Sequence, residues 1–227
     1  MQLLLRALLI GAVVGVLAPL AVLYFPALTN ASTQTSEPRS VGDDLYRRGL
    51  YAEAIAWYTE QAAKGDAAAA RRLGVEYMDG KGGVVQRDYE KARSYHLQAA
   101  KAGDSRSMFD LGTIYEGGLG VPADLIEAGK WFEWAAKYGH PQGQYNFATM
   151  IETGEAGRKD EVEAYMYYLL AASQGVGGIA FDLKTNRVIT DGETPLGQLK
   201  RRLTPAQIDE ATARAKAFKP LEGPMPN

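Results

Sequence analysis

One short pattern recurs four times along this chain of 227 residues, at intervals of 38, 36 and 36 residues. Each copy has an aromatic residue, an alanine five residues later and a glycine three residues after that. The copies are Trp57, Ala62 and Gly65; Tyr95, Ala100 and Gly103; Trp131, Ala136 and Gly139; and Tyr167, Ala172 and Gly175. A fixed period of this length, with small and aromatic residues in register, is typical of stacked helical hairpins. The period therefore predicts an all-α solenoid.

The copy from Ser107 to Gly139 shows how one hairpin is built. A first helix is predicted over 107–116, and the glycines that follow it can adopt the positive φ that ends a helix. Asp124 is predicted to cap the second helix, with Glu127 three residues on at the spacing of a capping box. The residues expected on its inner side are Ala128, Trp131, Phe132, Ala135 and Ala136.

This copy resembles a Sel1-like repeat, a relative of the tetratricopeptide repeat. The pattern is Ser-x3-Leu-Gly-x2-Tyr-x2-Gly-x-Gly-Val-x2-Asp-x3-Ala-x2-Trp-Phe-x2-Ala-Ala-x2-Gly over residues 107–139. The resemblance extends to 69–103, which has two extra residues in its loop, to 143–175, where the loop differs, and to an opening hairpin over 43–65. It implies an α-α superhelical solenoid and a scaffold or adaptor role in multi-protein assemblies, often at the cell envelope.

The segments around the repeats define the predicted domain organisation. Residues 1–28 are a signal anchor or signal peptide, 29–40 a flexible linker, 41–176 the repeats, 177–219 an irregular segment followed by a capping helix, and 220–227 a disordered tail with three prolines. The capping helix is expected to begin at Thr204-Pro205, with Gln207 at the capping-box position. Its apolar stripe, Ile208, Ala211, Ala215 and Phe218, is suited to covering the last open hydrophobic surface of a solenoid.

The apolar run from Ala7 to Phe25 carries no charged residue. At 1.5 Å per residue it spans about 28 Å as a helix, close to the thickness of the bilayer hydrocarbon. An uncleaved single-pass anchor and a signal peptide cleaved after Ala31 both remain open. Arg6 favours a cytoplasmic N-terminus, so the folded part is expected on the periplasmic side of a bacterial inner membrane, or free in the periplasm after cleavage.

Composition excludes several classes of function. The chain has no cysteine, which excludes disulfides, thiolate metal sites and a cysteine nucleophile. Its net charge of −2 gives no basic surplus for nucleic acid. The two histidines, His96 and His140, fall in repeat columns of packing and turn residues. Since no cofactor, metal or catalytic pattern emerges, the chain is expected not to be an enzyme.

Two repeated features resemble functional sites, but a structural role explains each of them better. The glycine-rich loops at 80–83 and 117–120 do not follow strands and lack the order of a phosphate-binding loop, so they are predicted to be hairpin turns. Asp88, Asp124 and Asp160 recur at the start of each second helix, where a carboxylate caps free N–H groups.

A binding surface is predicted on the first helices of successive hairpins, suited to a protein or peptide segment. The candidate positions are Arg72, Glu76, Asp110, Thr113, Asn146 and Thr149. Trp134 is either a partner anchor or a local packing partner of Tyr138, one helical turn away. The alternative hypothesis is a binder of peptidoglycan or of cell-wall enzymes, with Gln144, Tyr145 and Asn146 as candidate contacts.

Overall fold

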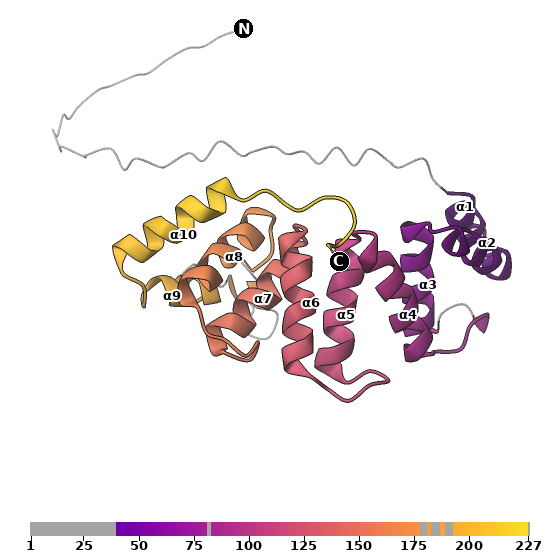
Figure 1. Cartoon of the computed structure of the whole chain (residues 1–227), viewed down its shortest axis with the longest axis horizontal. Coiled ribbons are helices and arrows are strands. Elements are labelled where there is room, and N and C mark those ends of the chain that lie inside the picture. The colour runs from indigo at the N-terminus through magenta and orange to yellow at the C-terminus, as the bar shows by residue number, and fades with distance from the viewer. Residues whose placement is uncertain (1–39, 81–82, 178–180, 183–186, 189–192, 227) are drawn as a thin grey trace, which may run out of the picture. The chain divides into compact units, whose positions relative to one another are not determined.

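A computed structural model describes residues 40–80, 83–177, 181–182, 187–188 and 193–226. Figure 1 shows a succession of helical hairpins in which each hairpin packs on the next in chain order. The predicted signal segment and linker lie outside the described residues, except for Ser40 at the end of the linker. Within the described part, none of the helices is long and apolar enough to cross a membrane.

The described part contains ten helices, most of them 13 residues long, and one short ladder. The helices are α1 (Val41–Arg47), α2 (Tyr51–Ala63), α3 (Ala67–Asp79), α4 (Tyr89–Lys101), α5 (Ser105–Gly117), α6 (Leu125–Lys137), α7 (Pro141–Thr153), α8 (Glu161–Ser173), α9 (Pro195–Lys200) and α10 (Pro205–Ala217). Strands β1 (Phe181–Asp182) and β2 (Arg187–Val188) pair antiparallel, with Phe181 opposite Val188. The fold is the predicted helical solenoid.

Each hairpin is held together by a small residue on its first helix that faces a ring on its second. A Cβ added at Gly112 of α5 would lie 2.5 Å from the Phe132 ring of α6. The same holds for Gly74 of α3, where a Cβ would lie 2.6 Å from the ring of His96 in α4. The absence of a side chain lets the two helices approach closely, so the repeated small column and the aromatic column are two sides of one contact.

The fully buried aromatic column lies one residue after the column that defines the sequence pattern. Tyr58, His96, Phe132 and Tyr168 are all buried, with at most 2% of their surface exposed. In the pattern column, by contrast, Trp131 is only half-buried. It packs on a cluster that includes Ala100 of the preceding hairpin and Met108 of its own hairpin. Trp131 therefore packs at the border of the contact between the two hairpins, partly exposed to solvent.

The predicted caps are confirmed for the three second helices. The side chains of Asp88, Asp124 and Asp160 accept hydrogen bonds from the backbone N–H three residues on, at 2.9–3.0 Å. The capping box predicted for Asp124 is not completed, because the Glu127 carboxylate pairs with Lys130 at 2.9 Å. An exposed lysine one turn ahead competes for the glutamate.

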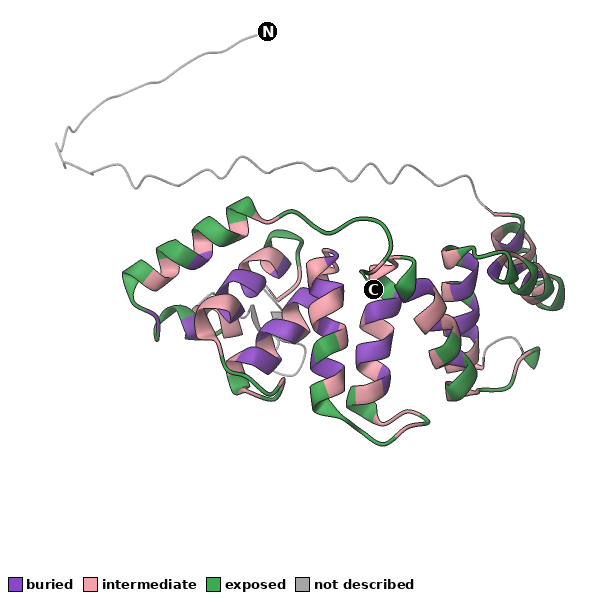
Figure 2. Ribbon diagram, in the orientation of Figure 1, coloured by how far each residue is buried: buried purple, intermediate pink, exposed green. Residues whose placement is uncertain are grey.

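The chain after the fourth hairpin closes the solenoid, as predicted. α10 begins with a complete capping box between Thr204 and Gln207 and packs along α8. Ala211 is fully buried, and Ile208, Ala215 and Phe218 contact the same core cluster. Figure 2 shows that most of the outer side of α10 is exposed or half-buried. One apolar face and one polar face are what a terminal helix of a repeat protein requires.

The C-terminal tail differs from its prediction. Disorder was expected over 220–227, but the described part of the tail returns from α10 across the ends of α6 and α4 (Figure 1). The Leu221 N–H donates to the Lys137 carbonyl at 2.9 Å, and the Met225 N–H donates to the Lys101 carbonyl at 3.0 Å. Composition alone favoured disorder because the acceptors belong to distant helix ends, which a local pattern does not reveal.

Candidate interaction surface

Five of the predicted partner contacts form two columns on the first helices. Arg72, Asp110 and Asn146 stand at equivalent positions of α3, α5 and α7, and Thr113 and Thr149 share a second column. Arg72 is exposed, whereas the other four are half-buried. The name first-helix row is used below for these five residues.

Most of the first-helix row is tied to the polar tips of the buried aromatic column. The Tyr58 hydroxyl donates to Asp43 Oδ1 at 2.8 Å, and the Arg72 guanidinium lies 3.0 Å from the same oxygen. In the fourth hairpin the Thr149 hydroxyl lies 3.0 Å from the Tyr168 hydroxyl, which donates to Glu152 at 2.8 Å. These contacts provide hydrogen-bond partners for the hydroxyl groups of the buried tyrosines Tyr58 and Tyr168. They also orient the row's side chains.

The ring of His96 joins Ser107 and Asp110, a grouping that local sequence did not reveal. His96 Nδ1 lies 3.3 Å from Ser107 Oγ and 3.6 Å from Asp110 Oδ2. A catalytic serine and carboxylate must contact opposite ring nitrogens of their histidine. Here both approach the same nitrogen, Nε2 faces the backbone of Gly74, and Ser107 is fully buried. The arrangement positions the ring within the core and does not activate a nucleophile.

The charge state of this cluster follows from its burial. Burial lowers the pKa of His96 to about 4, with the Asp104 carboxylate acting in the opposite direction. Burial also raises the pKa of Asp110 to about 6, and neighbouring Asp104 adds to the increase. His96 is therefore neutral at pH 7, so its 3.6 Å contact with Asp110 is not an ion pair.

Glu76 does not belong to the surface on which it was predicted. It is 7% exposed and stands in the column of Ile114 and Met150, which are core residues. Burial of the phenol, together with a hydrogen bond between Tyr46 and Glu76, raises the pKa of Tyr46 to about 12. In the first full repeat, a carboxylate that pairs with α1 thus replaces an apolar core residue. The apolar residues Ile114 and Met150 at the equivalent positions were the sequence signal that this column faces the core.

Trp134 has both a local partner and a more distant one. Its ring centroid lies 6.4 Å from that of Tyr138, which confirms the local packing. It also lines a cavity of about 390 Å³ together with Lys137 and four residues that follow α10, namely Phe218, Lys219, Leu221 and Pro226. The contact with the C-terminal tail had no signal in the repeat pattern.

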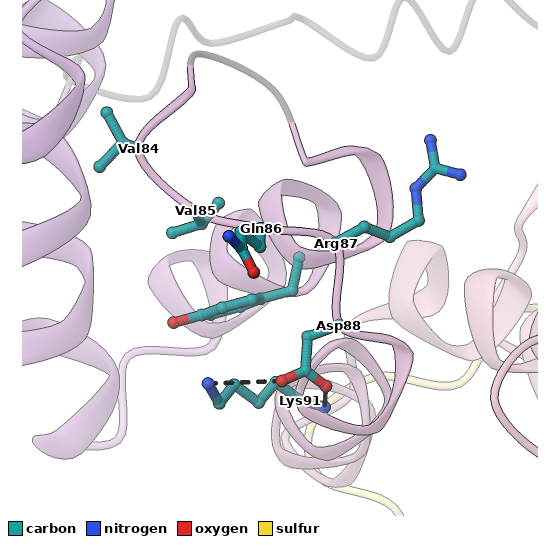
Figure 3. A pocket seen from close by; sticks show the side chains of 7 residues that line it. Val84, Val85, Gln86, Arg87, Asp88 and Lys91 are labelled. Carbon is teal, nitrogen blue, oxygen red and sulfur yellow. Dashed lines mark hydrogen bonds and ion pairs between the residues drawn. The ribbon is translucent and has the colours of Figure 1, made fainter.

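A second cavity, of about 290 Å³, lies at the turn between α3 and α4 (Figure 3). It is lined by Tyr77, Val84, Val85, Gln86, Arg87, Asp88 and Lys91. Asp88 is engaged as the cap of α4 and lies 3.3 Å from the Lys91 ammonium, which in turn lies over the Tyr77 ring. The Lys91 ammonium is thus already paired, and residues 83–88 are part of the connection between α3 and α4.

Two of the three residues predicted as glycan contacts are engaged in packing. Gln144 is fully buried, and its amide bonds to the Ala136 carbonyl and to Gln174. The Tyr145 ring packs edge-on against Tyr168, at a centroid distance of 5.4 Å. Both side chains therefore serve the packing of the third and fourth hairpins.

His140 caps α7, because its Nδ1 accepts the Gly143 N–H at 3.1 Å. Asp66 and Asp104 do the same in the equivalent turns. A ring nitrogen can accept this bond only when it is unprotonated. Burial and the nearby Arg106 lower the pKa of His140 to about 4.

These pKa values predict acid sensitivity. Since both histidines titrate at about 4 in the folded chain and near 6.5 when unfolded, the unfolded chain binds protons first, and stability falls as pH drops from 6.5 to 4. Asp110, raised to about 6, opposes this trend between pH 6 and 4. His140→Asn keeps a cap but removes one titrating group. Urea unfolding measured at several pH values should show a slope that is shallower by up to about 1.4 kcal/mol per pH unit. An unchanged slope would contradict the assignment.

Comparison with known proteins agrees with this geometry. The family model described as Sel1 repeat matches residues 67–104, 105–140 and 141–176. Those bounds coincide with the hairpins α3–α4, α5–α6 and α7–α8.

Individual relatives match over parts of their length. A Sel1 repeat protein from Oxalobacter formigenes is 30% identical with a TM-score of 0.56, covering 59% of this chain and 54% of its own. A protective antigen of uropathogenic Escherichia coli with an SLR fold is 29% identical with a TM-score of 0.55, covering 77% of this chain and 36% of its own.

A curated protein, a chitin synthase regulator of Saccharomyces cerevisiae, is 36% identical over 79 residues, which are 35% of this chain and 11% of that protein. The chain thus spans about a tenth to a half of the length of these relatives. Residues 67–176 of this chain consist of three consecutive Sel1 repeats.

Proposed function

We propose that this protein is a non-enzymatic scaffold that binds a protein or peptide segment along its first-helix row. The observation that carries the proposal is the register of Arg72, Asp110 and Asn146 on three successive first helices, within Sel1 repeats. Repeat stacks present equivalent positions at regular intervals, which suits an elongated partner. The row is polar with little net charge, so hydrogen bonds are expected to dominate recognition.

The scaffold is proposed to act on the periplasmic side of a bacterial inner membrane. The uncharged run from Ala7 to Phe25 supports this location, because its length matches a bilayer-spanning helix. Two of the similar solved structures come from bacteria. A phosphatase that is active only after export, fused behind residue 40, should be active in cells. Activity of a cytosol-only reporter at the same position would contradict the proposed location.

Site-specific crosslinking tests the surface itself. A photoreactive amino acid is placed at Arg72 or Asn146, on the first-helix row, and at Lys130 as a control. Lys130 is exposed on α6, a second helix. The two row positions should capture the same protein, identified by mass spectrometry, and the control should not. Equal capture at all three positions, or none at the row, would argue against this surface.

A further inference from the structure

The tail, residues 219–226, has a short repeat of its own. The pair Pro220-Leu221 is followed four residues later by Pro224-Met225. In each pair the proline has no N–H, and the next residue donates its N–H to a carbonyl of the folded body. The tail thus offers one peptide donor and one apolar side chain every four residues.

The acceptors of these bonds occupy equivalent positions of neighbouring repeats. Lys101 is the last residue of α4 and Lys137 the last residue of α6, 36 residues later. The final carbonyls of a helix have no partner within it, so they are available to an incoming donor. Four residues of extended chain reach at most about 14 Å, enough to link neighbouring hairpins. A four-residue period in the tail therefore matches the 36-residue period of the repeats.

Apolar contacts accompany both bonds. Met225 packs on a cluster that includes Met108 and Tyr138. Leu221 lines the cavity beside Trp134, yet it remains 45% exposed, and the cavity keeps a volume of about 390 Å³. The tail thus follows the spacing of the repeats but does not fill the cavity beside Trp134.

The turn glycines give the tail close access to the backbone. A Cβ at Gly103 would lie 2.1 Å from the Gly223 carbonyl oxygen, and one at Gly139 would lie 3.0 Å from Pro220. Both glycines have positive φ, which the turn requires in any case. Because these turns carry no side chain at Gly103 and Gly139, the tail can contact their backbone directly.

We propose that the ends of α4 and α6, with Trp134 and Tyr138, form a docking surface for an extended partner segment in which a proline-apolar pair recurs every four residues. The tail is a resident ligand of this surface and shields it from competing segments. The surface is separate from the first-helix row, so the inference goes beyond the proposed function and can succeed or fail independently of it.

Peptide binding to the full chain tests the proposal. The probe is a fluorescent peptide of residues 219–226, Lys-Pro-Leu-Glu-Gly-Pro-Met-Pro. The double variant Leu221→Ala/Met225→Ala removes the apolar anchors of the resident tail. Because a surface occupied by its own ligand binds a competitor in proportion to the free fraction, the variant should bind the probe about tenfold or more tightly than the unaltered chain. Glu222→Ala, a change at an exposed tail residue, should behave like the unaltered chain.

Two further experiments test the four-residue spacing of the probe and the role of Trp134 separately. A probe with one extra glycine before its second proline keeps the eight original residues in order but breaks the four-residue period, and should bind at least about tenfold more weakly. Adding Trp134→Ala to the double variant should also weaken binding, with far-UV circular dichroism confirming an intact fold. Equal binding of the two probes, or no gain in the double variant, would overturn the proposal. A mass of twice the monomer by light scattering, lost in the double variant, would overturn it in favour of tail exchange between two copies.

Discussion

Replacing Phe132 by alanine is expected to lower the free energy of unfolding by about 3–5 kcal/mol, as for other buried aromatic residues. The ring is fully buried, faces Gly112 and packs against Phe109 at a centroid distance of 5.6 Å. Removing it leaves a cavity inside the central hairpin, where neighbouring helices hold the walls apart. Urea unfolding followed by far-UV circular dichroism measures the change.

Alanine substitutions at two other residues of the same helix serve as comparisons for Phe132→Ala. Leu125 is 43% exposed, so Leu125→Ala should change stability by less than about 0.5 kcal/mol. Trp131, which is half-buried, should fall between the two when replaced by alanine. If Phe132→Ala cost less than Trp131→Ala, the buried aromatic column would have been assigned incorrectly.

Gly112→Val is expected to destabilise the fold by about 3 kcal/mol, at the upper end of typical overpacking costs. The first added carbon alone would lie 2.5 Å from two atoms of the Phe132 ring. The ring is enclosed and cannot move aside, so α5 and α6 must separate. The midpoint of urea unfolding should shift accordingly.

Gly117, the last residue of the same helix, provides the matched control. An added Cβ there would come no closer than 3.4 Å to Leu119, and the residue is exposed. Gly117→Ala should therefore leave stability unchanged or raise it by less than about 1 kcal/mol, because alanine favours the helix. A loss at Gly117 as large as that at Gly112 would show that flexibility, and not close packing, explains both glycines.

The periodic features were the most predictable from sequence. The hairpins, the capping aspartates and the terminal helix each depend on residues within one or two helical turns. Repetition then fixes the neighbours, because every hairpin meets a copy of itself. Phe132 was placed correctly on the inner side of its helix for this reason.

Departures from the repeat were harder to predict. Glu76 was placed on the surface by counting from the packed columns of the first helices, but its partner Tyr46 lies on the preceding hairpin. His96 was assigned to aromatic packing, and only folding brings Ser107 and Asp110 to its ring. At such positions the environment is set by side chains distant in sequence, whose contacts no local pattern encodes.

The sequence by itself determined that the chain forms stacked helical hairpins and that Asp88, Asp124 and Asp160 cap their second helices. These features follow from local backbone preferences repeated at a constant period. Only the tertiary structure decided that Phe132 and not Trp131 is fully enclosed, and that the tail lies across Lys101 and Lys137. Burial and tail position depend on surfaces that exist only after the hairpins have packed.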